Sequence, residues 1–184
     1  MNLTNTASVI ITQRKEFVEL LGFETRNKYE IFDQNKNLLG FCAEQQKGFL
    51  GIILRQVLGH WRSFEIHFFN ELRQEVFKTM HPFRFFFQEF TVLDKSSRSL
   101  GTIKQRFGIL QKKFDVLSVT GELVFEMRSG FFQFWTFPFY NRIGEERAVI
   151  KKKWSGLLKE AFMDADNFVV EFNDPKLSQD ERTL

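Results

Sequence analysis

The basic residues carry the clearest chemical signal in this sequence. Lys151, Lys152 and Lys153 are consecutive and are followed by Trp154. Ammonium groups beside an aromatic side chain that favours the membrane–water interface are suited to binding lipid phosphates. The run therefore predicts an anion-binding surface, and the alternative is an exposed strand end with solvated charges.

A second basic group lies nearer the middle of the chain. Lys104 and Arg106 occupy alternate positions of a predicted strand, Leu100–Phe107, so we expect both on one face. Lys112 and Lys113 follow after a short break. Together these residues predict a basic groove for a lipid headgroup or another anion.

An acidic run provides the candidate metal site. Asp164 and Asp166 alternate, and Glu171 follows in the next predicted strand. Carboxylate oxygens are the ligands that calcium prefers, but the Gly and Glu positions of an EF-hand loop hold Val169 and Pro175 here. The alternative is a helix-to-strand turn whose carboxylates accept hydrogen bonds from backbone N–H groups.

The sequence does not predict an enzyme or a cofactor other than calcium. His60, His67 and His81 lack metal-ligand spacing, and no nucleophile elbow, phosphate-binding glycine loop or zinc-protease motif occurs. Cys42 is the single cysteine, which excludes a disulfide within the chain and fits a reducing, cytoplasmic location. Its place on an alternating segment predicts a small core residue.

The elements that must position these residues are predominantly β-hairpins. Alternating segments separated by polar turns recur along the chain, as in Tyr29–Asp33, Gln34–Asn37 and Leu38–Glu44. Repeated hairpins of this kind predict a mainly β protein, either an antiparallel sandwich or a barrel.

Two segments have helical signals instead. Phe49–Trp61 carries an apolar stripe at helical spacing, formed by Leu50, Ile53, Leu54, Val57, Leu58 and Trp61. We expect it to contact a membrane through Leu50, Ile53, Leu54, Leu58 and Trp61, and the alternative is a lid on a barrel end. Near the C-terminus, Ser178 and Glu181 form a capping-box pattern, which predicts that a helix begins there.

Phenylalanine is unusually abundant, with 25 among 184 residues. Phe83–Leu93 and Phe131–Tyr140 are predicted as strands in which consecutive aromatic residues make both faces apolar. We expect core packing for most of them; the alternative is an outer face that meets another chain or acyl tails.

Length and charge limit the remaining classes of fold and partner. A chain of 184 residues with net charge +3 is enough for one folded domain. Residues 160–184 carry net −5, which leaves +8 on the rest and favours an anionic partner. Nucleic acid is the weaker choice because the aromatic segments carry few basic residues. No apolar run is long enough to span a bilayer, so we expect a cytoplasmic protein, at most peripheral to a membrane.

The chain resembles the phospholipid scramblase family, within the tubby-like superfamily that includes the LURP-one-related proteins. The most specific match is Trp154-Ser155-Gly156, Glu160-Ala161-Phe162 and Asp164-Ala165-Asp166-Asn167-Phe168. Phe23–Ile31, Arg62–Ile66 and His81–Arg84 resemble earlier hairpins of the family. The resemblance covers nearly the whole chain.

The resemblance implies one domain over residues 1–184, a closed antiparallel barrel of about twelve strands around a C-terminal helix. Residues 1–20 would be an arm and first strand, and residues 174–184 the start of that helix. Because the chain stops there, we expect a truncated helix and a barrel axis that is empty or filled by an apolar helix or ligand.

The family's functional segments map onto this chain with departures. Its calcium pattern maps onto Asp164, Asp166 and the following strand, but its final carboxylate position holds Pro175. Its import-type basic segment maps onto Lys151–Trp154. The palmitoylated cysteine cluster and the Pro-rich arm of animal members have no counterpart in this sequence.

Three functions follow from this evidence. The first is a scramblase-like protein that binds anionic phospholipid at a membrane surface and assists transbilayer lipid movement. The second is a tubby-like regulatory or interaction module that binds protein or nucleic acid. The third is a carrier that holds an apolar ligand in the barrel.

Overall fold

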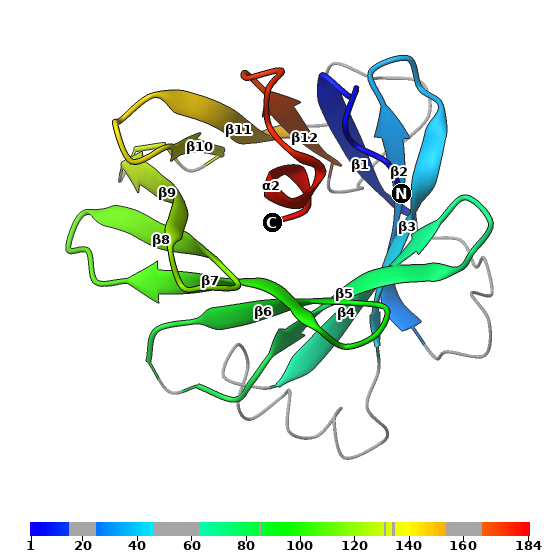
Figure 1. Ribbon diagram of the computed structural model, residues 1–184, viewed down its shortest axis with the longest axis horizontal. Coiled ribbons are helices and arrows are strands. Elements are labelled where there is room, and N and C mark those ends of the chain that lie inside the picture. The colour runs from blue at the N-terminus through cyan, green and yellow to red at the C-terminus, as the bar shows by residue number, and fades with distance from the viewer. Residues whose placement is uncertain (15–24, 46–62, 85, 131, 134, 154–166) are drawn as a thin grey trace.

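The protein is a closed antiparallel barrel. The computed structural model describes residues 1–14, 25–45, 63–84, 86–130, 132–133, 135–153 and 167–184. Each strand is hydrogen-bonded to its sequence neighbours, and β1 closes the ring against β12 (Figure 1). The twelve strands are β1 (Ser8–Arg14), β2 (Thr25–Asp33), β3 (Leu38–Gln45), β4 (Phe64–Asn70), β5 (Glu75–His81), β6 (Glu89–Asp94), β7 (Ser99–Arg106), β8 (Gln111–Ser118), β9 (Leu123–Gly130), β10 (Thr136–Tyr140), β11 (Glu146–Lys153) and β12 (Asn167–Phe172).

Five hairpin turns at one end of the barrel share a construction. In each turn, a side-chain oxygen of the last residue of the first strand, or of the residue after it, accepts a hydrogen bond from the backbone N–H four residues later. The residues that accept are Asp33, Asn70, Asp94, Ser118 and Asn141. The residue three positions after each has positive φ: Lys36, Arg73, Ser97, Gly121 and Gly144. This is turn chemistry that the local sequence specifies. We call this end, formed by residues 33–37, 70–74, 94–98, 118–122 and 141–145, the turn end.

Alternation along the strands builds an apolar interior. Val9, Ile31 and Cys42 form one buried cluster with Leu3. Val116 and Phe125, from β8 and β9, form another with Leu177 of the C-terminal segment. Residues of opposite parity on these strands therefore face outward.

The C-terminal segment turns back into the barrel and fills part of its axis. The helix α2 (Gln179–Thr183) begins at Ser178 with the predicted capping box, and Figure 1 shows it inside the ring of strands. Leu184 packs on the Val116–Phe125 cluster. Short as it is, α2 occupies the interior at the turn end, so the chain's own C-terminal segment fills this part of the axis.

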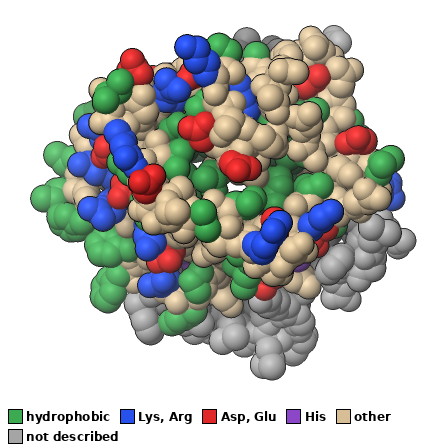
Figure 2. Space-filling model, in the orientation of Figure 1, with side chains coloured by type: hydrophobic (Ala, Val, Ile, Leu, Met, Phe, Trp, Pro, Cys, Tyr) green, Lys and Arg blue, Asp and Glu red, His purple; other side chains and the backbone are tan. Residues whose placement is uncertain are grey.

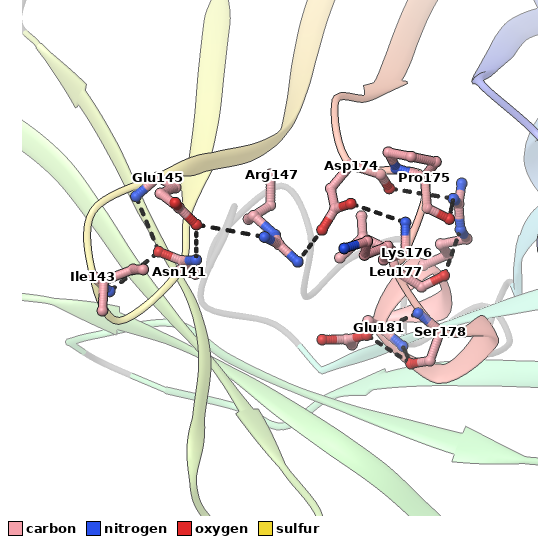
Figure 3. A network of polar contacts seen from close by, with 11 residues as sticks. Asn141, Ile143, Glu145, Arg147, Asp174, Pro175, Lys176, Leu177, Ser178 and Glu181 are labelled. Carbon is pink, nitrogen blue, oxygen red and sulfur yellow. Dashed lines mark hydrogen bonds and ion pairs between the residues drawn. The ribbon is translucent and has the colours of Figure 1, made fainter.

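A polar network fixes the entry of this segment (Figure 3). Arg147 lies between Glu145, at 3.5 Å, and Asp174, with which it forms a close ion pair. Asp174 also accepts a hydrogen bond from the backbone N–H of Lys176 at 2.9 Å. The turn that carries the chain from β12 into the interior is thus held by β11.

Two aromatic segments differ from the predicted strands. β5 ends at His81 and β6 begins at Glu89, so residues 82–88 form a connection. β10 begins at Thr136, so residues 131–135 connect it to β9. Phe86 and Phe132 are 82% and 88% exposed. For these two residues the expectation of core packing was wrong, because they lie on connections and not in the alternation of a sheet.

In the described parts of the chain, no helix has the length and apolarity needed to cross a bilayer. The space-filling view shows apolar side chains lining the inside of the ring, with many lysines and arginines on its outer side (Figure 2).

Candidate functional site

A row of cations crosses three neighbouring strands on the outer face. Arg106 of β7 is paired in register with Lys113 of β8, and Lys113 with Arg128 of β9. Lys113 is three residues from the interior Val116, and Arg128 three from the interior Phe125, so both face outward. Like charges directly opposite one another destabilise a sheet, so neighbouring carboxylates or a bound anion would stabilise this arrangement. We call Arg106, Lys113 and Arg128 the basic row.

Two half-buried carboxylates, Asp115 and Glu126, lie beside the basic row. Arg106 lies 3.4 Å from Asp115, and Arg128 lies 3.3 Å from Glu126. The two arginine side chains are 65% and 46% exposed, so solvent screens both pairs. Within the described residues, Lys113 has no carboxylate at ion-pair distance. The row therefore keeps a positive potential.

Lys104 occupies a different electrostatic setting. It shares the outer face of β7 with Arg106, but its neighbours in register are Glu89 of β6 and Asp115 of β8. Asp115 is followed in the same row by Glu126. Carboxylates on both sides lower the positive potential at Lys104, although Glu89 also pairs with Arg84 and Asp115 with Arg106.

A groove adjoins the basic row at the end of the barrel opposite α2. Its volume is about 320 Å³, and the β7–β8 connection, residues 107–110, forms much of its wall. Arg106 and Lys112 supply its charges, and Phe87 and Gln133 line it from neighbouring connections. The Lys112 ammonium is 5.9 Å from the centre of the Phe137 ring. A phosphate-bearing headgroup is an appropriate size and charge for such a groove.

The lysines of the run in β11 point to different faces of the sheet and have different partners. Lys151 Nζ is 2.5 Å from Glu171 Oε2, so its charge is paired. Lys152 points to the other face, where its ammonium lies 4.8 Å from the centre of the Trp135 ring and 5.9 Å from that of Phe168. Lys153 pairs through its backbone with Asn167; its side chain and Trp154 lie outside the described residues.

The other predicted sites are largely outside the described residues. Asp164 and Asp166 fall there, and Glu171 is engaged by Lys151. Among the residues that are described, no group of three or more His, Cys, Asp or Glu side chains is placed to hold a metal ion. Calcium binding stays a prediction. The membrane-contact stripe, Leu50, Ile53, Leu54, Leu58 and Trp61, also lies outside the described residues.

Cys42 is buried in the barrel interior, at 6% exposure, and burial raises the pKa of its thiol to about 12. The thiolate is the reactive form of cysteine. We therefore expect a thiol reagent at mildly alkaline pH to modify the native chain at least about a hundredfold more slowly than the denatured chain. Equal rates, measured from the release of the reagent's chromophore, would contradict this placement.

Sequence reasoning missed two features of this region. It placed Lys113 only near the groove and did not include Arg128, because their proximity depends on strand register. It also assigned residues 83–88 and 131–135 to strands. The signal that could have revealed these connections is compositional, since only one of their residues, Arg84, is charged.

The comparisons with known proteins agree with this architecture. A family model described as Scramblase matches residues 1–184. The chain belongs to the scramblase family. It is 30% identical to human phospholipid scramblase 1 over 188 residues, covering 92% of this chain and 57% of that protein. Mouse phospholipid scramblase 1 is 31% identical, with 92% and 55% covered.

This scramblase-family chain thus spans little more than half the length of those relatives. The yeast altered inheritance rate of mitochondria protein 25 is 23% identical, with 93% of this chain and 60% of that protein covered. An X-ray structure of an Arabidopsis thaliana protein superposes with a TM-score of 0.50 at 14% identity, covering 92% of this chain and 83% of that one. The likeness supports the tubby-like barrel fold.

Proposed function

We propose that this scramblase-family protein binds anionic phospholipid at a membrane surface and assists transbilayer lipid movement. The observation that carries the proposal is the basic row, Arg106, Lys113 and Arg128. Three cations placed opposite one another cost stability, and a lipid phosphate or carboxylate would relieve that repulsion. The adjoining groove offers space for the headgroup.

The lipid-movement part of the proposal rests on the family alone. The named relatives are phospholipid scramblases, and this chain matches them over 92% of its length. A lipid-flip assay with the protein reconstituted in vesicles checks it: we expect faster exchange of a fluorescent phospholipid between leaflets than in protein-free vesicles. Unchanged exchange in vesicles that hold bound protein would contradict this part and leave lipid binding standing.

Neutralising the basic row should weaken binding to anionic vesicles. Each Lys or Arg near an anionic surface contributes about 1 kcal/mol, so Arg106→Gln, Lys113→Gln and Arg128→Gln together should reduce vesicle partitioning at low salt by roughly a hundredfold. Flotation with phosphatidylserine-containing vesicles measures this change. The effect should shrink as salt is added, because salt screens surface charge.

A matched variant separates the site from bulk charge. Lys36→Gln, Arg73→Gln and Lys95→Gln remove the same charge from exposed positions of the turn end. We expect this variant to bind nearly as well as the unmodified chain. Equal losses in both variants would show that net charge, and not the basic row, drives binding. Tight salt-sensitive binding of duplex DNA with no vesicle binding would favour the nucleic-acid module instead.

A further inference from the structure

Three connections with exposed apolar side chains lie together at the end of the barrel opposite the turns. They join β5 to β6 (residues 82–88), β7 to β8 (107–110) and β9 to β10 (131–135). One groove is lined by Phe87 of the first, Phe107 and Leu110 of the second and Gln133 of the third, which shows that the three are contiguous. The large exposed apolar residues of this surface are Phe83, Phe86, Phe87, Phe107, Ile109, Leu110, Phe132 and Trp135. We call it the loop end.

The turn end has a different surface. Its exposed apolar residues, Leu72, Val119 and Ile143, occur one to a turn and are separated by polar side chains. Single exposed apolar residues are normal on soluble proteins, whereas a contiguous group marks a surface that contacts another apolar phase. The asymmetry gives the barrel one end that favours such contact.

Hydrogen bonds hold two of the three connections of the loop end in place. Ser129 is buried and its hydroxyl bonds with the carbonyl oxygens of Gln133, at 2.7 Å, and Thr136, at 3.0 Å. Gln88 and Gln105 exchange two hydrogen bonds, at 2.8 and 2.9 Å, which tie residues 82–88 to β7. These bonds oppose movement of the two connections toward the interior.

Charge indicates which apolar phase would cover this surface. The three connections contain Arg84 as their one charged residue and have no acidic residue. Just behind them lie Arg106, Lys112, Lys113 and Arg128, at the adjoining ends of β7, β8 and β9. This order of side chains matches the layers of an anionic bilayer. The apolar connections would reach the acyl chains, and the lysines and arginines behind them would lie among the charged headgroups.

We propose that the loop end inserts its apolar side chains into the headgroup–acyl boundary of an anionic bilayer, so that this end of the barrel faces the membrane. The inference rests on the proposed function and adds to it the docking surface and the orientation. The basic row then lies at headgroup level, where it meets lipid phosphates, and α2 lies at the end directed away from the bilayer.

Two triple variants test the orientation. Phe107→Ser, Ile109→Ser and Leu110→Ser remove apolar side chains from the loop end, and Leu72→Ser, Val119→Ser and Ile143→Ser remove the same number from the turn end. In flotation with vesicles of phosphatidylcholine and phosphatidylserine, we expect the loop-end variant to lose about tenfold or more of its partitioning, at low and high salt alike. The turn-end variant should bind like the unmodified chain. Thermal unfolding of both variants checks that they are folded.

A second measurement reports insertion directly. Trp135 lies in the β9–β10 connection, and the chain has two other tryptophans, so the measurement uses the variant Trp61→Phe, Trp154→Phe, in which Trp135 alone fluoresces. Phospholipids brominated near the top of their acyl chains should quench the fluorescence of Trp135 in this variant. If the unmodified chain fails to float with anionic vesicles, the proposed function and this inference both fall. If it floats and the two triple variants float equally well, or Trp135 is not quenched, the inference alone is overturned and the loop end is a surface for a protein.

Discussion

Replacing Arg182 by Met is expected to lower the free energy of unfolding by about 3 kcal/mol. Arg182 is 8% exposed, and its guanidinium donates to the carbonyl oxygens of Thr6 at 2.6 Å and Leu177 at 3.0 Å. It also lies 4.6 Å from the centre of the Phe172 ring. Methionine fills similar space but leaves these buried carbonyl groups without their donor, and it removes one of the hydrogen bonds between the first residues of the chain and the last.

Chemical denaturation followed by circular dichroism measures this loss. Arg182→Lys should cause a smaller loss, because an ammonium retains the charge but cannot reach carbonyls on both sides as the planar guanidinium does. Arg98→Met is the matched surface control; its side chain is 82% exposed, and we expect a change below about 1 kcal/mol. If Arg182→Met were as stable as Arg98→Met, the buried hydrogen bonds of α2 would not contribute as argued.

Replacing Gly101 by Ala should be nearly as damaging, with an expected loss of about 2–3 kcal/mol. A Cβ atom at this position would lie 2.4 Å from the carbonyl oxygen of Leu117 and 2.6 Å from a methyl carbon of Leu184. The first contact is with backbone of the neighbouring strand, so β7 and β8 would have to separate. The second would displace the end of α2 from the interior.

Two further variants resolve these contributions. Gly130→Ala is the matched control, because a Cβ there has no atom within 4 Å among the described residues, and we expect it to leave the unfolding midpoint nearly unchanged. Leu184→Ala added to Gly101→Ala should restore only part of the loss, since the backbone contact with Leu117 persists. A fully stable Gly101→Ala variant would show that α2 does not approach β7 this closely.

The contacts of Leu177 and Leu184 in the interior limit what else the barrel axis can hold. Because Leu177 and Leu184 occupy the interior at the turn end, an apolar ligand carried in the barrel would have to share the axis with them. The anion-binding candidates lie elsewhere, on the outer face and at the loop end. Destabilising α2 should therefore lower stability without directly changing the charges that face a membrane.

Local sequence determined much of the fold. An Asp or Asn at the end of a strand specifies a hairpin turn, as at Asp33, Asn70 and Asp94. Its side chain accepts a hydrogen bond from the backbone N–H four residues later, within the same turn. The capping box of Ser178 and Glu181 likewise predicted where α2 begins. These signals act over a few residues, so a single stretch of sequence contains all the partners involved.

The candidate site depended on contacts between distant parts of the chain. Arg106, Lys113 and Arg128 are separated by a connection and a turn, and only the register of β7, β8 and β9 makes them neighbours. The same register surrounds Lys104 with carboxylates, and the pairing of β11 with β12 neutralises Lys151 through Glu171. The net charge of the sequence therefore indicated an anionic partner, but the tertiary structure decided which lysines and arginines create a positive electrostatic potential at the surface.

The aromatic residues show the same division. The sequence by itself determined that this chain has far more phenylalanine than one sheet face requires and that its hairpins form a barrel or a sandwich. Only the antiparallel pairing of neighbouring strands, with their observed ends, decided that residues 82–88, 107–110 and 131–135 emerge at one end, where Phe86 and Phe132 face solvent. The physical reason is that alternation specifies the two faces of a strand, whereas the end at which a strand stops depends on its hydrogen-bonded neighbours.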